Sequence, residues 1–232
     1  MYENILFEKK DGVAYLTLNR PDRLNALNSA VLKELDDALA AIDGDAEIRV
    51  LVVRGAGEKA LAAGADITEM QSMEAEAGMA FGAFGQKVFA KIEALRQPSI
   101  AMIPGFALGG GCELALACDI RIASEKARFG QPEVGLGITA GFGGTQRLAR
   151  IVGVSNAMEL ILTAKTINAA RAQELGLVSH VYPPEELMDK AMELAQAIAA
   201  NAQVAVRQSK AAIRRGLQTD MYTGAAYEAE AF

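Results

Sequence analysis

A short run of consecutive aliphatic residues at positions 50–53 restricts the possible folds more than any other feature of this chain. Its sequence is Val-Leu-Val-Val, it has the length of a strand, and glycines follow it at 55 and 57. An unbroken run of this kind is typical of a strand that is covered on both faces, as in a parallel sheet. Residues 99–103 and 120–123 have the pattern of two further strands. Because helical patterns lie between these segments, we expect an α/β fold with ligand sites at loops that leave strands.

Local signals add detail at both ends of the chain. Residues 5–9 and 13–18 flank Asp11-Gly12, which predicts a β-hairpin. Aliphatic residues then recur at helical spacing up to Gly44, and we expect Ser29 to cap that helix. We interpret residues 61–66 as a loop rich in glycine and alanine, followed by helices to about residue 95. From residue 143 onward helical patterns dominate, apart from a strand-like segment at 178–181.

The charge balance and length exclude several classes of protein. The chain has 232 residues, with 23 Lys and Arg against 29 Asp and Glu, and a net charge of −6. This acidic balance argues against a nucleic-acid partner, whose binding depends on clustered basic side chains. The N-terminus lacks the pattern of a signal peptide, and no stretch of about 18 uncharged apolar residues occurs. We therefore expect no membrane partner, and a soluble protein of the cytoplasm.

Cysteine and histidine are too scarce for several kinds of site. Cys112 and Cys118 have the spacing of neither a disulfide framework nor a metal pair, so we interpret them as small buried side chains. The single histidine, His180, is the only candidate proton carrier for a hydrolase triad. Its strand-like context lies far from any glycine-rich turn and favours a surface or packing role. We expect no metal site, because one histidine and two cysteines do not form a usual zinc site.

Residues 135–140 match the pattern G-x-G-x-x-A of dinucleotide-binding loops. The match is weak, because the segment follows Gln131-Pro132-Glu133 instead of a strand. No acidic residue at the end of a following strand is available to bind a ribose, and a Walker lysine motif is absent. We therefore do not expect nucleotide phosphate to bind here.

Two other glycine-rich loops have a pattern that suits an anion. Residues 62–66 (AAGAD) have side chains small enough for a ligand to approach the backbone, and Gly109–Gly111 open a helix. Unpaired N–H groups and the positive end of the helix dipole meet at a helix N-terminus. Two such donors would form an oxyanion hole for an enolate or a tetrahedral oxygen. The alternative is that both loops are tight turns without a ligand, and the patterns alone favour neither.

Two carboxylates lie in poorly polar segments close to these loops. Glu113 follows the three glycines and precedes the apolar residues 114–117, and Glu133 lies between Pro132 and a glycine-rich segment. Burial raises the pKa of a carboxyl group toward the range that is useful in general acid–base catalysis. Taken alone, each glutamate fits a structural role better.

Four motifs in a fixed order carry a resemblance that covers nearly the whole chain. They are residues 62–67 (AAGADI), 103–114 (IPGFALGGGCEL), 129–133 (FGQPE) and 141–148 (GFGGTQRL). Together they resemble the enoyl-CoA hydratase/isomerase superfamily, also called the crotonase superfamily. Within it the sequence is most similar to the subgroup of bacterial short-chain 3-hydroxybutyryl-CoA dehydratases.

The resemblance implies a crotonase-like spiral of β-β-α units, with the CoA-thioester site in residues 1–190 and a helical, trimerising C-terminal region in residues 191–232. Homotrimers, or homohexamers made of two trimers, are implied as well. The resemblance also implies that the chain ends before the last helical segment usual in the family. At position 140 this chain has alanine, where many relatives have proline.

The resemblance further implies an acyl-CoA thioester as substrate and reversible addition of water to a short trans-2-enoyl-CoA. The implied catalytic groups are Glu113, Glu133 and the backbone N–H groups of Ala65 and Gly110. Expected contacts to the CoA thioester come from these residues: Arg23, Leu24, Ala63, Ala65, Asp66, Ile67, Thr68 and Gly110. No separate cofactor is implied, since CoA is part of the substrate.

Two alternatives differ from a hydratase. The first is an enoyl-CoA isomerase or another enolate-forming relative, but the presence of both glutamates favours hydration. The second is a non-enzymatic, RNA-binding relative, which should have a helix face rich in lysine and arginine. The net charge and the absence of any basic run longer than Arg214-Arg215 argue against that role.

Overall fold

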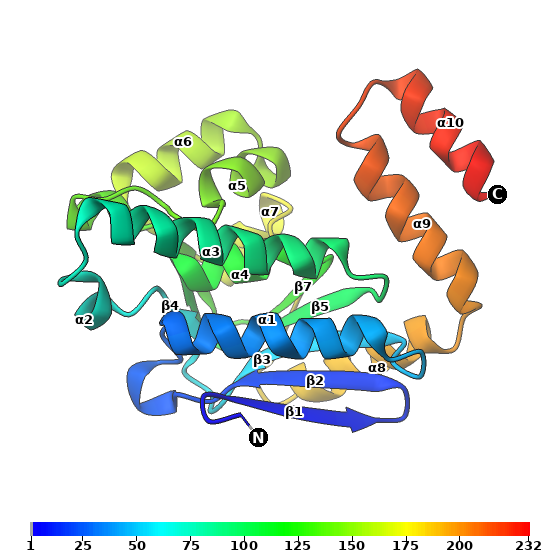
Figure 1. Cartoon of the computed structure of the whole chain (residues 1–232), viewed down its shortest axis with the longest axis horizontal. Helices are drawn as coiled ribbons and strands as arrows, with labels where there is room; N and C mark the ends of the chain where they lie inside the picture. The colour runs from blue at the N-terminus through cyan, green and yellow to red at the C-terminus, as the bar shows by residue number, and fades with distance from the viewer. Residues whose placement is uncertain (1) are drawn as a thin grey trace.

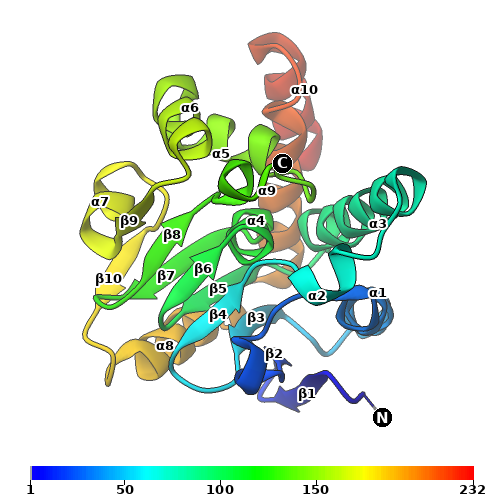
Figure 2. The same cartoon turned by 90° about the vertical axis from the view of Figure 1, so that its left-hand side faces the viewer.

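In the computed structural model, which describes residues 2–232, strands form two sheets with helices packed around them (Figures 1 and 2). The strands are β1 (Ile5–Lys10), β2 (Val13–Leu18), β3 (Val50–Gly55), β4 (Ala60–Ala63), β5 (Ser99–Ile103), β6 (Phe106–Leu108), β7 (Ile120–Ser124), β8 (Arg128–Gly130), β9 (Thr166–Asn168) and β10 (His180–Tyr182). The helices are α1 (Ser29–Gly44), α2 (Ile67–Met70), α3 (Ala75–Ala94), α4 (Gly110–Ala117), α5 (Gly144–Val152), α6 (Val154–Thr163), α7 (Ala169–Glu174), α8 (Leu187–Ala199), α9 (Gln203–Gly216) and α10 (Met221–Ala231), with short 3-10 helices η1 (Pro21–Arg23) and η2 (Glu133–Leu136).

A repeated β-β-α unit generates both sheets. The strand order is β1-β2-β3-β5-β7-β10 in the larger sheet and β4-β6-β8-β9 in the smaller one. Each of the pairs β3–β4, β5–β6 and β7–β8 therefore gives one strand to each sheet before the chain enters a helical segment. Neighbouring strands from successive units are parallel. The expected α/β spiral is confirmed.

Strand β3 of the large sheet is buried on both faces at residues 50–53, as the aliphatic run predicts. Val50, Val52 and Ile100 pack in one hydrophobic cluster with residues of α8. Leu51 and Val53 point to the other face and belong to a larger cluster that includes α1 and α3. Figure 2 shows α1 and α3 on one side of the molecule and α8 below the large sheet. All four residues of the run are fully buried.

Local chemistry explains the hairpin and the start of α1. Asp11 and Gly12 have φ angles of 51° and 78°, so both turn residues adopt the left-handed conformation that matches the twist of β1 and β2. The N-cap of α1 is Asn28, one residue before the expected Ser29, because the Asn28 side chain accepts a hydrogen bond from the N–H of Val31 at 2.9 Å. The hairpin prediction is confirmed, and the predicted cap was wrong by one residue.

The small sheet contains the elements that the sequence did not indicate. Strand β4 occupies the first half of the segment 61–66 that we interpreted as a loop, and β6, β8 and β9 have three residues each. Small residues in β4 allow α4 to pack very closely, since a Cβ atom at Gly111 would lie 2.0 Å from the carbonyl oxygen of Ala62. The alanine- and glycine-rich composition therefore reflects close packing and not a flexible loop.

The last two helices lie apart from the sheets. Figure 1 shows α9 and α10 as a pair that projects from one end of the molecule. The expected boundary between residues 190 and 191 falls within α8, whose residues Leu187, Ala191 and Ala195 are buried against the large sheet. No helix among residues 2–232 combines the length and the apolar character needed to cross a membrane.

Candidate active site

A cavity of about 690 Å³ lies where β4, β6 and β8 end and α4 and η2 begin. Its walls include both glutamates singled out in the sequence, Glu113 and Glu133, together with the backbone of residues 63–65, Gly109 and Gly110. The site thus lies at loops that leave strands, as expected for an α/β fold.

Glu113 projects from the first turn of α4, and its side chain is almost completely buried, with 1% of the residue exposed. Its Oε1 accepts hydrogen bonds from the backbone N–H groups of Phe142, at 2.8 Å, and Gly144, at 2.6 Å. The pKa of Glu113 is raised to about 7, mainly by burial and also by the charge of Glu133, while the two hydrogen bonds and Arg147 act in the opposite direction. A carboxyl group with this pKa can gain or lose a proton near neutral pH.

Glu133 is the first residue of η2 and is half-buried. Burial raises the pKa of this carboxyl group too. The amide nitrogen of the buried Gln131 donates to both carboxylate oxygens of Glu133 at 3.1 Å when the amide is oriented to satisfy its hydrogen bonds. Glu133 also lies directly over Gly109, where a Cβ atom would be 2.6 Å from Oε1. Position 109 therefore requires glycine, both for this space and for its φ of 50°.

Two of the residues that line the cavity, Gly110 and Ala65, have backbone N–H groups that are not used in the fold of residues 2–232. Gly110 is the first residue of α4, so its N–H has no partner within the helix. Ala65 follows β4, and its neighbours Gly64 and Asp66 make the backbone hydrogen bonds to Leu27 that leave the N–H of Ala65 unused. Within residues 2–232 neither N–H donates a hydrogen bond. Two unused donors beside a helix N-terminus have the geometry of an oxyanion hole.

The far wall of the cavity is apolar. Phe142 is buried and makes edge-to-face contacts with Phe81 and Phe89 of α3, at centroid distances of 5.2 and 5.5 Å. Leu136 and Ile138 line the cavity from the segment after Glu133 and are exposed. An apolar wall beside two carboxyl groups and two backbone donors fits a ligand with a short hydrocarbon part attached to a carbonyl group.

The remaining residues expected to contact CoA fall into two groups. Ala63 and Ile67 line the cavity together with Ala65 and Gly110. Arg23, Leu24, Asp66 and Thr68 lie outside its lining. Arg23 is exposed in η1, and Leu24 adjoins β4 through its carbonyl group, which accepts from the N–H of Ala63 at 3.0 Å.

The carboxylate of Asp66 has structural partners. It pairs with Arg20 at 2.9 Å and caps α2 by accepting from the N–H of Thr68 at 3.1 Å. The hydrogen bond and charge of Arg20 hold the pKa of Asp66 below its usual range, although burial opposes this. The pair fixes the loop that contains Ala65, and nothing in the composition of the segment indicated a partner 46 residues away.

Sequence reasoning gave no role to the residues that hold the two glutamates. Gln131 and the amides of Phe142 and Gly144 are the direct partners, and all three lie inside motifs that carried the resemblance. The repeated glycines at 141, 143 and 144 were the available signal, because Gly143 has a φ of 101° and a Cβ atom at Gly144 would lie 2.9 Å from Oε1 of Glu113.

His180, Cys112 and Cys118 do not line the cavity, whereas Leu136, Ile138 and Thr139 of the G-x-G-x-x-A segment do. His180 is exposed on β10, beside Tyr182, and Cys112 and Cys118 are buried free thiols. The G-x-G-x-x-A segment begins within η2 and lacks the strand–turn–helix context of a dinucleotide loop.

The chain is similar to known proteins in both sequence and fold. The sequence profile of the enoyl-CoA hydratase/isomerase family matches residues 8–232. The chain is 56% identical to the short-chain-enoyl-CoA hydratase of Clostridium acetobutylicum, over 99% of this chain and 88% of that protein. It is 52% identical to the crotonyl-CoA hydratase of Syntrophomonas wolfei, over 100% of this chain and 89% of that protein. The crystal structure of an enoyl-CoA hydratase from Bacillus anthracis superposes with a TM-score of 0.96 at 45% identity, over 99% of this chain and 89% of that one.

The β-β-α spiral, with two carboxyl groups and two free backbone donors around one cavity, defines an enzyme of the crotonase fold. Within that class, this chain belongs to the enoyl-CoA hydratase/isomerase family.

Proposed function

We propose that the protein is an enoyl-CoA hydratase that adds water reversibly to a short trans-2-enoyl-CoA such as crotonyl-CoA. The single observation that carries this proposal is the presence of Glu113 and Glu133, both with a raised pKa, in one cavity with the free N–H groups of Ala65 and Gly110. The names of the similar proteins from Clostridium and Syntrophomonas support the reaction and the short acyl chain.

In the proposed mechanism the thioester oxygen accepts hydrogen bonds from Ala65 N–H and Gly110 N–H, which places the Cα=Cβ bond beside the two carboxyl groups. Ionised Glu113 removes a proton from water as the water oxygen attacks Cβ. The electron pair of the double bond moves toward the thioester, and negative charge develops on its oxygen. The two N–H groups and the N-terminus of α4 stabilise that charge.

The second half of the reaction delivers a proton to Cα. Protonated Glu133 supplies it, and the enolate becomes a 3-hydroxyacyl-CoA. After one turnover Glu113 holds the proton and Glu133 is ionised, so the pair must exchange a proton with solvent before the next cycle. Because the charge of Glu133 raises the pKa of Glu113, the two carboxyl groups titrate as a coupled pair. No separate cofactor enters this scheme, since CoA is part of the substrate.

The direct experiment follows the ultraviolet absorbance of the conjugated thioester of crotonyl-CoA with purified protein. Loss of absorbance and formation of 3-hydroxybutyryl-CoA are expected. A parallel sample with a 3-enoyl-CoA separates the two reactions of the family, because an isomerase would create the conjugated absorbance. No turnover of crotonyl-CoA in either direction would refute the proposal.

A series of trans-2-enoyl-CoA thioesters from four to sixteen carbons tests the acyl length. We expect kcat/KM to be highest at four to six carbons and to fall gradually, because an apolar pocket discriminates by about 1–3 kcal/mol per methylene once a wall is met. Phe142 and Phe81 form that wall in the cavity. A flat profile, or a maximum at ten carbons or more, would contradict the short-chain assignment.

We propose in addition that the protein forms homotrimers or homohexamers and that it acts in the cytoplasm, in fatty-acid or butyrate metabolism. Helices α9 and α10 support an assembly, because they project from the sheets and expose Ile213, Leu217, Met221 and Tyr222. Sedimentation equilibrium gives the assembly mass directly. A monomer at micromolar concentration would refute the oligomer.

A further inference from the structure

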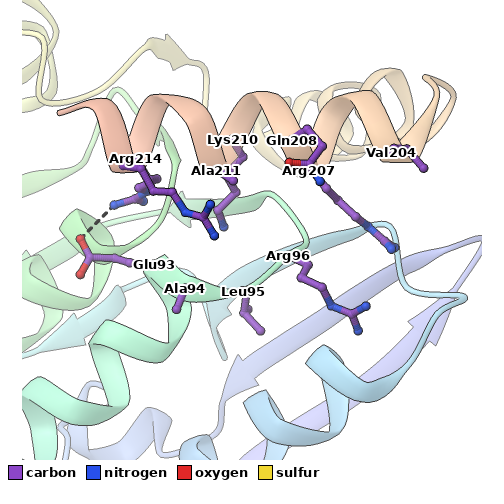
Figure 3. A pocket seen from close by; sticks show the side chains of 11 residues that line it. Glu93, Ala94, Leu95, Arg96, Val204, Arg207, Gln208, Lys210, Ala211 and Arg214 are labelled. Carbon is purple, nitrogen blue, oxygen red and sulfur yellow. Dashed lines mark hydrogen bonds and ion pairs between the residues drawn. The ribbon is translucent and has the colours of Figure 1, made fainter. Parts of the chain in front are cut away.

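A chain of half-buried ion pairs runs from helix α9 to the first half of α5. Arg214 of α9 bonds Oδ1 of Asp119 at 2.7 Å and Oε1 of Glu93 at 2.9 Å. The other oxygen of Glu93 accepts from Arg147 of α5 at 2.6 Å. Figure 3 shows Glu93 at the end of α3 directed at Arg214, beside a cavity of about 560 Å³ that separates α3 from α9. One carboxylate therefore joins two arginines from distant parts of the sequence.

The second hydrogen bond of Arg147 connects this chain of charges to the site. Its Nη1 donates to the carbonyl oxygen of Phe142 at 2.7 Å. The backbone N–H of Phe142 donates to Oε1 of Glu113, and so does the N–H of Gly144. The guanidinium therefore holds the short backbone segment that in turn holds the carboxyl group.

The backbone around Arg147 is shaped to receive the guanidinium. The side chain of Arg147 is only 14% exposed. A Cβ atom at Gly143 would lie 2.3 Å from Nη1 of Arg147, and the φ of 101° at Gly143 independently requires glycine. The guanidinium of Arg147 thus packs against Gly143, donates to the carbonyl group of Phe142, and forms an ion pair with Glu93.

We propose that Arg147 is a positioning residue for Glu113, acting through the backbone of residues 142–144, and that Glu93 orients Arg147 and couples α9 to this segment. The inference rests on the proposed hydratase function. Arg147 does not line the substrate cavity, so its effect should fall on the position of Glu113 and not on substrate contacts.

The test compares Arg147→Met, Arg147→Lys and Glu93→Gln with the matched control Arg150→Met. Arg150 lies one turn further along α5, is exposed, and within residues 2–232 its side chain forms hydrogen bonds with Gln146 alone. For Arg147→Met we expect kcat for crotonyl-CoA to fall about 10- to 100-fold with little change in KM, since small displacements of a reacting group cost rates of this order. Arg147→Lys should lose less, because an ammonium group can satisfy one of the two acceptors. Glu93→Gln should also lose less, and Arg150→Met should match the wild type.

The pH profile separates positioning from a merely structural role. The charged or titratable groups near Glu113 are Glu133 from η2, Arg147 from α5 and the Cys112 thiol on its own helix. From α3, Glu93 is bonded to Arg147. Loss of Arg147 removes a cation and loosens two amide donors, and both changes raise the pKa of Glu113. The acidic limb of kcat/KM should therefore move to higher pH in Arg147→Met and stay in place in Arg150→Met.

Three results would overturn the inference. They are a cooperatively folded Arg147→Met with wild-type kcat, an equal loss in Arg150→Met, and a loss confined to KM. If Arg147→Met does not fold, Arg147→Lys and Glu93→Gln decide by the same criteria. The wild type in the same assay reports on hydratase activity itself. A crystal structure of Arg147→Lys or Arg147→Met, in which the amides of Phe142 and Gly144 should have moved away from Glu113, gives a readout independent of any substrate.

Discussion

Replacing Glu113 with glutamine should stabilise the fold while it abolishes most of the activity. The carboxyl group is almost fully buried, and burial raises its pKa from 4.5 to about 7. One pKa unit corresponds to 1.36 kcal/mol, so ionised Glu113 costs the folded state about 3 kcal/mol. Glutamine keeps the oxygen that accepts from Phe142 and Gly144 but carries no charge. Hydration should fall by about 10²–10⁴ because the variant cannot accept the proton of water.

The pH dependence of this stabilisation follows from the direction of the pKa shift. Because the pKa of Glu113 is higher in the folded than in the unfolded state, the folded protein retains a proton that the unfolded chain has lost. Below pH 4.5 the group is neutral in both states, and the cost is absent. The cost grows as the pH rises from 4.5 to about 7 and is complete above that. The glutamine variant should therefore gain about 1 kcal/mol at pH 5.5 and about 3 kcal/mol at pH 8.

Urea denaturation of the wild type and Glu113→Gln at pH 5.5 and pH 8 measures this difference. For a chain of 232 residues the gain at pH 8 corresponds to a rise in Tm of roughly 6–12 °C. Glu34→Gln is the matched control. Burial opposes ionisation of Glu34, but hydrogen bonds from Glu3, Asn4 and Ile5 lower its pKa overall, so this variant should lose stability at pH 8. Equal stability of Glu113→Gln and the wild type at pH 8, or the same gain at both pH values, would refute the reasoning.

Three further predictions concern the same cavity. Glu133→Gln should lower the rate of hydration by about 10²–10⁴. The double variant with Glu113→Gln should lose much less than the product of the two single losses, because both glutamates act on one water molecule. Multiplicative losses in steady-state kinetics would contradict this. Gly110→Pro removes one oxyanion donor and should lower kcat by about 10²–10³. Gly110→Ala keeps the N–H group and should lose far less. A proline variant with normal thermal melting and wild-type kcat would exclude a catalytic role for the N–H of Gly110. A Cβ atom at Gly85 would lie 2.3 Å from the Phe142 ring, so Gly85→Ala should lose about 1–3 kcal/mol of stability together with activity. Gly78→Ala in the same helix, with nothing within 4 Å, should instead gain up to about 1 kcal/mol, and equal effects of the two in thermal melts would contradict the packing argument.

The sequence predicted elements whose signal is local and missed those whose cause is tertiary. The hairpin at Asp11-Gly12 and the strands β3, β5 and β7 follow from turn chemistry and aliphatic runs, and all of them are present. Strand β8 has only three residues, too few to show alternation, and forms because β6 and β9 lie on either side of it. Strand β4 is made of alanine and leucine, and its composition is set by the close approach of α4.

The same distinction applies to the site. Each glutamate stands next to a glycine-rich turn, a local pattern that by itself favoured a structural role, and the catalytic role came from the resemblance that the motif order carries. The amides that bond Glu113 belong to Phe142 and Gly144, 29 and 31 positions further along the chain, and the ion pair of Glu93 with Arg147 joins residues 54 positions apart. No periodicity or motif spacing in a single sequence predicts which two opposite charges at that separation form an ion pair.

The parallel pairing in the large sheet has a consequence for how the chain is made. The last strand, β10, pairs with β7 through His180 and Ile122, so roughly sixty residues must be synthesised after β7 before its neighbour exists. During that interval one edge of β7 offers unpaired N–H and C=O groups, which other chains can bind. Non-local parallel pairing also slows folding and exposes intermediates to aggregation. We therefore expect the nascent chain to need protection on the ribosome until β10 emerges, and slower synthesis between residues 124 and 180 to reduce the yield of native protein.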